Sequence, residues 1–295
     1  MIRPMPGIFR RLLLPVVALT ALTGPAAGAP AAEPTTRLVV RGDDMGSSQA
    51  SNEAAVRCFK DGVMRDVELM AVGPWFPEAA RLLRANPALD VGLHLALTSE
   101  WENVKWRPLT AAPSLVERTG FFFPMIWPGP NYGKDRALKE QPWKLDDIER
   151  ELRAQIELTK REVPQLSHLS DHMGFQSLGP EVGALVKRLA VEYGLDIDPQ
   201  ANGAKWVGWD GKPETSAQKV ESFVRVLERL GPGTWVFVDH PALDTPEMRA
   251  VGHVGYDTVA VDRQGVTDAW TSGAVKDAVR RRGIELVSYK DLVRK

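Results

Sequence analysis

Short apolar runs alternate with amphipathic stretches from about residue 36 to the end of the chain. Short apolar runs bounded by turn residues are typical of buried strands, and apolar residues three or four apart predict helices. The longest amphipathic stretch has Ile148, Leu152 and Ile156 at intervals of four. The runs that predict strands are 38–40, 67–72, 90–97, 166–169, 235–238 and 284–287. The stretches that predict helices are 52–60, 77–85, 144–162, 180–193, 216–230 and 273–282.

This alternation predicts an α/β fold, because neighbouring parallel strands need helical crossovers. Polar motifs follow several of the predicted strands, which favours a (β/α) barrel-like fold, distorted or incomplete, over an open sheet. We expect a single domain over residues 35–295. No glycine-rich dinucleotide or phosphate-binding pattern follows any predicted strand, so we expect no nucleotide cofactor.

One segment, residues 99–143, interrupts the alternation and is rich in proline, glycine and aromatic residues. Long irregular segments in compact domains usually serve function or cover a site. Two interpretations are compatible. The aromatic faces could bind the apolar faces of sugar rings, or the segment could be a covering loop packed by its own aromatic residues.

The N-terminus has the organisation of a secretory signal peptide. Three arginines in the first eleven residues precede an apolar stretch, 12–22, and small residues follow it. Cleavage is expected after Ala29 or Ala31, so the predicted signal peptide is 1–31. A membrane anchor is the alternative, but the apolar stretch contains Pro15 and is shorter than the ~20 residues that a span requires. We expect an exported protein, periplasmic or secreted, with no stable membrane insertion after processing.

The composition is that of an ordinary globular protein, with 44% hydrophobic and 25% charged residues and a formal net charge of −1. Such a balance gives no reason to expect a nucleic-acid partner. Cys58 is the single cysteine, which excludes an intrachain disulfide and a cysteine-based zinc site. The expected partner is a small-molecule or oligosaccharide substrate, and whether the chain forms a homo-oligomer stays open.

The candidate chemistry begins with the adjacent carboxylates Asp43 and Asp44, at the end of the first apolar run. Two adjacent carboxylates repel one another, and a metal ion would relieve that repulsion. His94 lies in a predicted strand, with Gly92 and Ala96 on the same face. These small neighbours leave room for a ligand or metal. A hydrogen-bonded core histidine is the alternative for His94 taken alone.

Two more polar motifs follow predicted strands. One contains His168, Asp171 and His172, and the other is His240 followed by Pro241. One carboxylate and two histidines can hold a divalent metal with open positions for water and substrate, which suits hydrolysis. The same ligand types accept Zn²⁺, Mg²⁺, Mn²⁺ or Fe²⁺, so oxygenation by non-haem iron is also open on ligand identity. We expect one divalent ion, Mg²⁺ or Zn²⁺.

The order of these motifs resembles the YdjC family of carbohydrate deacetylases, which includes chitooligosaccharide deacetylases and hopanoid-biosynthesis relatives. The resemblance covers nearly all of residues 35–295. Arg41 and Gly42 stand where that family usually has Asn and Ala, and Met45 stands where it has Phe. The motifs that carry the resemblance are Asp43-Asp44-Met45-Gly46 with Asn52-Glu53, Gly92-Leu93-His94-Leu95-Ala96-Leu97-Thr98, Ser167-His168-Leu169-Ser170-Asp171-His172, His240-Pro241 and Arg282-Gly283-Ile284-Glu285-Leu286-Val287-Ser288-Tyr289.

The resemblance implies a (β/α) barrel-like fold and N-deacetylation of an acetylated sugar. By position it implies that Asp44, His94 and His172 bind the metal, that Asp43 is the general base, and that His240 is the proton donor.

The resemblance also implies supporting roles for His168 and Asp171, near the metal or the substrate. Arg263 stands where the family often has an arginine before its final helix, and could bind substrate. A surface arginine is the alternative there. Two other functions stay open: a carbohydrate-binding protein without turnover, and a metal hydrolase of a non-sugar ester or amide.

Overall fold

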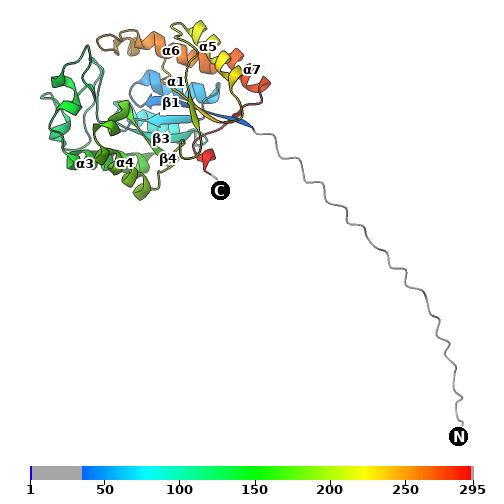
Figure 1. Ribbon diagram of the computed structural model, residues 1–295, viewed down its shortest axis with the longest axis horizontal. Coiled ribbons are helices and arrows are strands. Elements are labelled where there is room, and N and C mark those ends of the chain that lie inside the picture. Colours follow the sequence, from blue (N-terminus) through cyan, green and yellow to red (C-terminus); the bar gives the residue numbers. More distant parts are fainter. Residues whose placement is uncertain (2–34, 294–295) are drawn as a thin grey trace. The chain divides into compact units, whose positions relative to one another are not determined.

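The computed structural model describes residues 35–293 together with Met1 (Figure 1). The signal peptide predicted for residues 1–31 therefore lies outside the described residues, apart from its first residue. Within the described part, no helix has both the length and the apolar character needed to cross a membrane.

The sheet in the described residues has seven strands, and every ladder between them is parallel. The main order is β4-β3-β2-β1-β6-β5, and β7 pairs with the first part of β1. The carboxyl ends of parallel strands meet at one edge, so residues that follow different strands come together there. The strands are β1 (Thr36–Met45), β2 (Asp66–Leu69), β3 (Asp90–Leu95), β4 (Leu166–Asp171), β5 (Lys205–Val207), β6 (Gly233–Asp239) and β7 (Glu285–Leu286).

Helices connect these strands, as parallel pairing requires. Helices α5, α6 and α7 pack against one another, and α1 packs against α6. Helices α3 and α4 pack together, and α3 also packs against β3, at the green end of the domain in Figure 1. The helices are α1 (Gln49–Lys60), α2 (Phe76–Arg84), α3 (Leu145–Glu162), α4 (Pro180–Tyr193), α5 (Ser216–Arg229), α6 (Val259–Thr271) and α7 (Gly273–Arg281).

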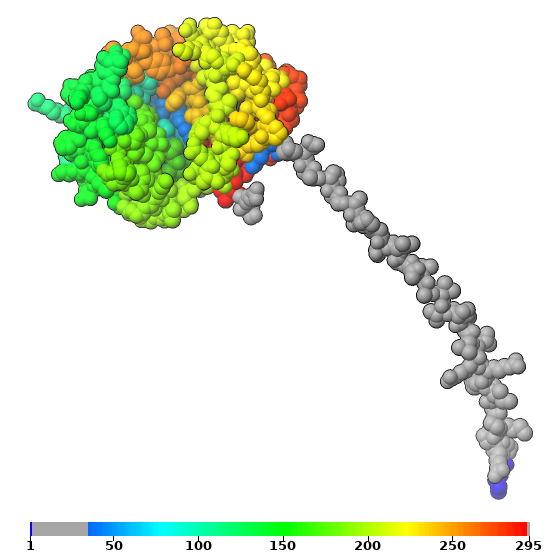
Figure 2. Space-filling view, viewed as in Figure 1, coloured from blue at the N-terminus to red at the C-terminus, as the bar shows by residue number. Residues whose placement is uncertain are grey.

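The sheet curves without closing. Strands β4 and β5 are its two edges, and no ladder joins them in the described residues. Figure 2 shows a hollow between green and yellow-green residues, with blue residues of the first part of the domain at its floor. The expected α/β fold with a distorted, incomplete barrel is confirmed.

Side chains of β1 alternate between two different environments. Leu38 and Val40 belong to the large core under the helices, whereas Val39 belongs to a smaller cluster with Val236 and Tyr289. Successive residues of a strand point to opposite faces, so Arg41 and Asp43 follow Val39 on the same face toward the carboxyl end of β1. The concave face of the sheet thus changes from apolar to charged toward the carboxyl ends of the strands.

Two elements were absent from the sequence prediction. Strand β5 has only three residues and lies at the edge of the sheet, so it carries little pattern. Helix α6 has the polar residues Arg263 and Thr267 among its buried positions, whereas Val261 is 56% exposed, so the helix lacks a clear amphipathic period. Gly265 lets this helix approach α5, since a Cβ there would lie 2.9 Å from the Lys219 side chain.

The aromatic segment 99–143 is mainly a covering loop. Trp101, Trp106 and Phe122 are buried within it, whereas the side chain of Trp127 is 45% exposed. The Trp106 indole N–H donates to the carbonyl of Thr98 at 2.7 Å. Of the two interpretations, packing by its own aromatic residues describes most of the segment.

Candidate active site

A bulge in β1 aims both acidic residues at the same place. In a regular strand Asp43 and Asp44 would point to opposite faces. The register between β1 and β2 shifts between Gly42 and Met45, and Asp44 has a φ of 70°. As a result His94 Nε2 lies 3.9 Å from Asp43 Oδ2 and 3.7 Å from Asp44 Oδ1. Bulges re-aim side chains in this way at the rims of barrels and beside active sites.

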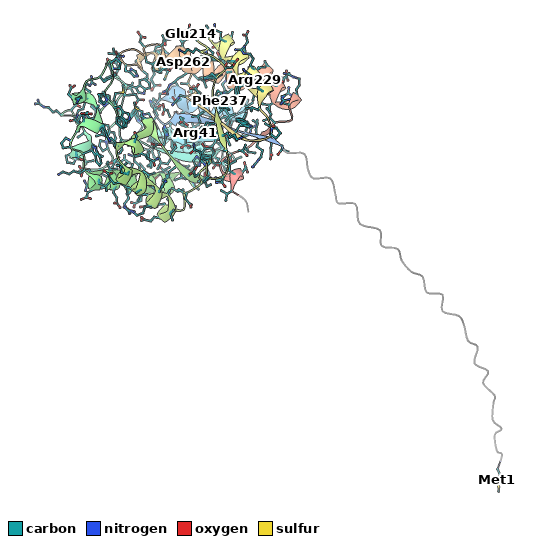
Figure 3. All side chains as sticks on the ribbon, viewed as in Figure 1. Met1, Arg41, Glu214, Arg229, Phe237 and Asp262 are labelled. Atoms are coloured by element: carbon teal, nitrogen blue, oxygen red, sulfur yellow. The ribbon has the colours of Figure 1, made fainter. Side chains whose placement is uncertain are left out.

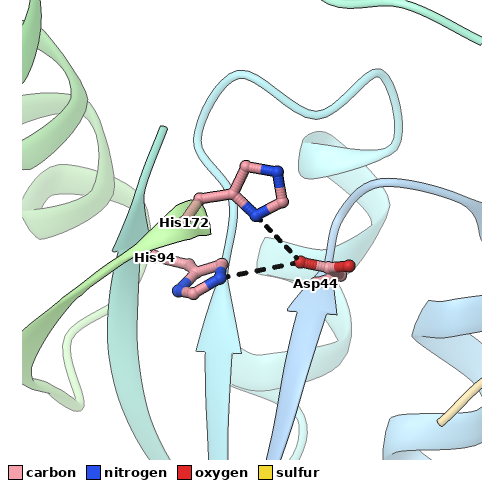
Figure 4. Close-up of side chains that lie close together, drawn as sticks. All are labelled: Asp44, His94 and His172. Atoms are coloured by element: carbon pink, nitrogen blue, oxygen red, sulfur yellow. Dashed lines mark ion pairs between the residues drawn. The ribbon is translucent and has the colours of Figure 1, made fainter. Parts of the chain in front are cut away.

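Three residues predicted as metal ligands come together from three elements (Figure 4). Asp44 lies on β1, His94 on β3, and His172 directly after β4. Asp44 Oδ1 is 3.7 Å from His94 Nε2 and 3.5 Å from His172 Nδ1. One donor atom from each residue lies within 4.8 Å of the other two, and all three side chains are buried. We call these residues the open cluster.

Hydrogen bonds orient His94 within this cluster. Its Nδ1 lies 2.7 Å from Ser170 Oγ, and the Ser170 hydroxyl donates to Glu68 Oε2 at 2.5 Å. A serine hydroxyl has one proton to give, so Ser170 accepts the proton of His94 Nδ1. His94 Nε2 therefore carries a lone pair that faces Asp44. Burial also lowers the pKa of His94, which favours the neutral ring that a metal requires.

Glu100 orients His172 in the same way. His172 Nε2 lies 2.9 Å from Glu100 Oε2 and donates to it, which directs Nδ1 toward Asp44. Burial alone would lower the pKa of His172, but Glu100 and Asp44 outweigh it and raise the pKa to about 10. A cation bound at Nδ1 would have to displace that second proton.

Two buried atoms of the open cluster have no hydrogen-bond partner: Asp44 Oδ1 and His172 Nδ1. Buried polar atoms without partners are costly, and an ion that both atoms ligate would remove that cost. Burial would raise the pKa of Asp44, but His240, Arg263 and His172 hold it well below its usual range. The residues therefore fit a divalent cation held by one carboxylate and two imidazoles.

Asp43 lies beside this cluster and is bound by the residue two positions before it. Arg41 Nε and Nη2 donate to the two oxygens of Asp43, each at 2.8 Å. Arg41 Nη1 also lies 3.7 Å from Glu68 Oε1. Burial alone would lower the pKa of Arg41, but these two carboxylates raise it well above its usual value. Asp43 is therefore ion-paired with Arg41, which fixes the orientation of its carboxylate.

His240 lies on the solvent side of the cluster, after β6. Its Nε2 is 3.9 Å from Asp44 Oδ2, and its side chain is 38% exposed. Asp239 accepts from the backbone N–H of His240 at 2.7 Å and lies 3.3 Å from its Nδ1. Burial would lower the pKa of His240, but Asp44 and Asp239 raise it. This arrangement favours a protonated ring that can donate a proton from Nε2.

Arg263 is not a surface residue, and it precedes the final helix α7. It lies within α6 and is buried, and its Nη2 is 2.9 Å from Asp44 Oδ2. The guanidinium also stacks over the Trp101 ring at 5.2 Å from its centroid. Arg263 thus binds the oxygen of Asp44 that faces away from His94 and His172.

His168 lies in a second buried cluster, with Asp66 and Glu68, which we call the closed cluster. Its Nε2 is 2.8 Å from Glu68 Oε1 and 3.4 Å from Asp66 Oδ1. These groups fill the room beside Gly92, since a Cβ there would lie 2.3 Å from Glu68 Oε2 and from His168 Nε2. The small neighbour of His94 therefore makes room for an internal ion pair as well as for the site. Asp171 stands apart from both clusters, and its Oδ2 accepts from Gln176 N at 3.3 Å.

The partners that orient the site were mostly missed by sequence reasoning. Glu68 offered a signal, since it is a lone carboxylate in an apolar strand, and Asp239 stands directly before His240. Glu100 offered none, because it lies in the irregular segment that follows β3.

Comparison with known proteins identifies the family of this chain. Residues 37–281 match the family described as YdjC-like protein. A carbohydrate deacetylase of Geobacillus stearothermophilus is 29% identical over 270 residues, which cover 86% of this chain and 96% of the relative. A chitooligosaccharide deacetylase of Klebsiella pneumoniae is 27% identical over 271 residues, covering 86% and 98% of the two chains.

Among solved structures, a "putative cellobiose-phosphate cleavage protein" of Enterococcus faecalis superposes with a TM-score of 0.68 at 21% identity. It covers 88% of this chain and all of that one, and its likeness supports the fold. The family match spans most of the described residues, and it bears out the resemblance seen in the motifs. The chain belongs to the YdjC-like family.

Proposed function

We propose that this protein is a metal-dependent carbohydrate deacetylase that removes N-acetyl groups from a sugar or oligosaccharide. One observation carries the proposal. The unpartnered buried atoms Asp44 Oδ1 and His172 Nδ1 face His94 Nε2, beside one carboxylate and one exposed histidine that are not among the three ligands. The deacetylase names of two relatives in the same family support the reaction class.

In this proposal Asp44, His94 and His172 hold the cation. A bound divalent ion, Zn²⁺ or Mg²⁺, polarises the acetyl carbonyl and lowers the pKa of water. Asp43 removes the proton of the attacking water, and Arg41 fixes the carboxylate by a hydrogen bond to each oxygen, with Oδ2 3.9 Å from His94 Nε2. His240 then protonates the leaving sugar amine from Nε2, while Asp239 holds its Nδ1 side. Arg263 keeps Asp44 ionised and in place.

The test is acetate release by the purified protein. The panel contains N-acetylglucosamine, chitotriose, peptidoglycan fragments, an O-acetylated glycan and a simple aryl acetate. We expect release from at least one N-acetylated sugar, its loss with chelator, and its return with Zn²⁺ or Mg²⁺.

The other outcomes separate the alternatives. Saturable glycan binding without acetate release by metal-loaded protein would replace the proposal with a binding protein. Release from the aryl acetate alone would make the protein a hydrolase of non-sugar esters.

We also propose that the protein acts outside the cytoplasm, on the basis of the signal-peptide pattern in residues 1–31. Fractionation of cells that express the full chain, with N-terminal sequencing of the product, tests this. A product that starts after Ala29 or Ala31 in the exported fraction is expected, and an unprocessed cytoplasmic product would contradict it.

A further inference from the structure

A groove of about 590 Å³ lies between the two edges of the sheet. Ser170 and Asp171 of β4 line one side, Trp206 of β5 lines the other, and Arg41 and Tyr289 lie at its inner end. Figure 3 labels Arg41 in the middle of the domain. We call this the seam groove, because it occupies the gap where the barrel does not close.

The seam groove shares two residues with the surroundings of the open cluster. Ser170 lines the groove and accepts from the Nδ1 of His94. Arg41 lines the groove and binds Asp43 through two hydrogen bonds of 2.8 Å. A molecule in the groove would therefore contact residues that bind directly to a proposed metal ligand and to the proposed base.

Trp206 gives the groove a flat apolar surface. Its side chain is 47% exposed, and the Arg41 guanidinium lies 5.6 Å from the centroid of its ring. An exposed indole in a cavity presents a large apolar face with a polar edge, which suits the alternating CH and OH groups of a sugar ring. Gln176 adds an amide at the same groove, near Asp171.

The charges of the groove favour a cationic occupant over an anionic one. Arg41 is already paired with Asp43 and Glu68. The remaining charged residues that line the groove are Asp171, Asp196, Asp198 and Lys187, an excess of carboxylates. Such an excess attracts an ammonium group and repels phosphate or uronate.

We propose that the seam groove binds an amino-sugar residue of the substrate chain, next to the sugar that is deacetylated, with Trp206 against the ring. This proposal rests on the proposed function and makes the substrate more specific. The substrate is an oligosaccharide that already contains free amino groups or gains them as the reaction proceeds. Anionic glycans are excluded from the groove.

Binding is measured by calorimetry with three probes that have no acetyl group and cannot turn over: a glucosamine tetramer, cellotetraose and tetragalacturonate. The wild type should bind the glucosamine tetramer most tightly, cellotetraose more weakly, and tetragalacturonate not at all. Trp206→Ala should weaken binding of the first two by about tenfold. Asp196→Asn should weaken binding of the glucosamine tetramer by about threefold and leave binding of cellotetraose unchanged.

Trp127→Ala is the matched control, since Trp127 is exposed to a similar extent and lies outside the groove. It should leave binding of all three probes unchanged. Unchanged binding in Trp206→Ala, or binding of tetragalacturonate as tight as that of the glucosamine tetramer, would overturn the proposal.

Kinetics separate this proposal from the proposed function. Trp206→Ala should raise KM for chitotriose about tenfold more than KM for N-acetylglucosamine. If KM rose equally for both substrates, the proposal of a sugar site in the seam groove would be wrong, and Trp206 would serve only to support Arg41. If the wild type released no acetate yet bound the glucosamine tetramer through Trp206, the groove would stand and the proposed reaction would fail.

Discussion

The open cluster and the closed cluster contain similar residue types, yet they differ in how their donor atoms are used. In the closed cluster, His168 Nε2 binds Glu68 Oε1 at 2.8 Å, and Ser167 Oγ lies 2.7 Å from His168 Nδ1. In the open cluster, the nearest approaches of Asp44 Oδ1 to the two histidines are 3.5 and 3.7 Å. Both nitrogens of His168 are hydrogen-bonded, although Asp66 Oδ1 at 3.4 Å has no hydrogen-bond partner, whereas the facing atoms of the open cluster are spaced around a common centre.

Charge alone does not explain the difference, because the pKa of His172 in the open cluster is also raised to about 10. The closed cluster combines an ionised Glu68, whose pKa is lowered to about 2 against the opposing effect of burial, with a protonated His168. The open cluster turns the second nitrogen of each histidine away, toward Ser170 and Glu100. The lesson is that a set of histidines and carboxylates indicates a metal site only when outer partners leave the inner lone pairs free.

The largest effect is expected from the carboxylate of the open cluster. Asp44→Asn should lose the bound metal and lower kcat/KM by at least about a thousandfold, because the charged ligand and its polarising ion are lost together. Elemental analysis of the purified variant and acetate release measure the two effects. Asp66→Asn, in the closed cluster, is the matched control and should retain the metal. Metal loss in Asp66→Asn with retention in Asp44→Asn would reverse the comparison.

A substitution at Asp43 distinguishes the proposed base from the proposed metal ligands of the open cluster. Asp43→Asn should retain the metal and lower kcat by about a hundredfold or more, because the amide cannot accept a proton from water. Metal content and single-turnover acetate release are the measurements. An active Asp43→Asn enzyme would show that Arg41 binds Asp43 for structure alone.

Ser170 connects the two clusters, since it bonds both His94 and Glu68. Ser170→Ala should weaken metal affinity by about 10- to 100-fold, because His94 loses the acceptor that orients its ring. Competition with a chromophoric chelator measures the affinity. Ser177→Ala is the control, since the Ser177 hydroxyl bonds only the carbonyl of Gly174 and is exposed. Equal affinities in the two variants would mean that the clusters act independently.

The fold was largely predictable, because parallel strands and their helices carry strong apolar periods. Helix 180–193 was predicted with the observed bounds. Strand β1 was predicted to be shorter than it is, because its second half is polar and faces the site. Helix α6 was missed because Arg263 and Thr267 are buried while Val261 is exposed, which removes the amphipathic pattern. Periodicity therefore locates elements that have an apolar buried face and a polar exposed face, and it fails where polar residues are buried, as in the second half of β1 and in α6.

The grouping of Asp44, His94 and His172 was predicted from the resemblance of the motifs to the family, and the three residues lie at or directly after the ends of three separate strands. Their partners were not. The bulge at Asp44 and the pairing of Arg41 with Asp43 depend on the register between β1 and β2. That register cannot be inferred from the residues of β1 alone. The burial of Arg263 beside Asp44 depends on how α6 packs. The resemblance of the motifs indicated the reactive groups, whereas tertiary packing determines their orientation.

The closed cluster should reveal itself in the pH dependence of stability. Burial opposes a charge on His168, but Asp66 and Glu68 raise its pKa to about 10, above the usual 6.5. A group with a raised pKa stabilises the fold fully below its unfolded pKa, and that contribution is lost as the pH rises through the folded value. We therefore expect the free energy of unfolding to fall between pH 6.5 and 10, by at most about 1.4 kcal/mol per pH unit from this group.

Urea unfolding of chelator-treated protein at several pH values from 6 to 9.5 measures this slope without a contribution from bound metal. His168→Gln removes the titrating ring while its amide can still donate to Glu68, so the variant should be less stable at pH 6 and its alkaline slope shallower. Parallel curves for wild type and variant would show that His168 does not exchange a proton on unfolding. The closed cluster would then be held by neutral hydrogen bonds, and its difference from the open cluster would rest on spacing alone.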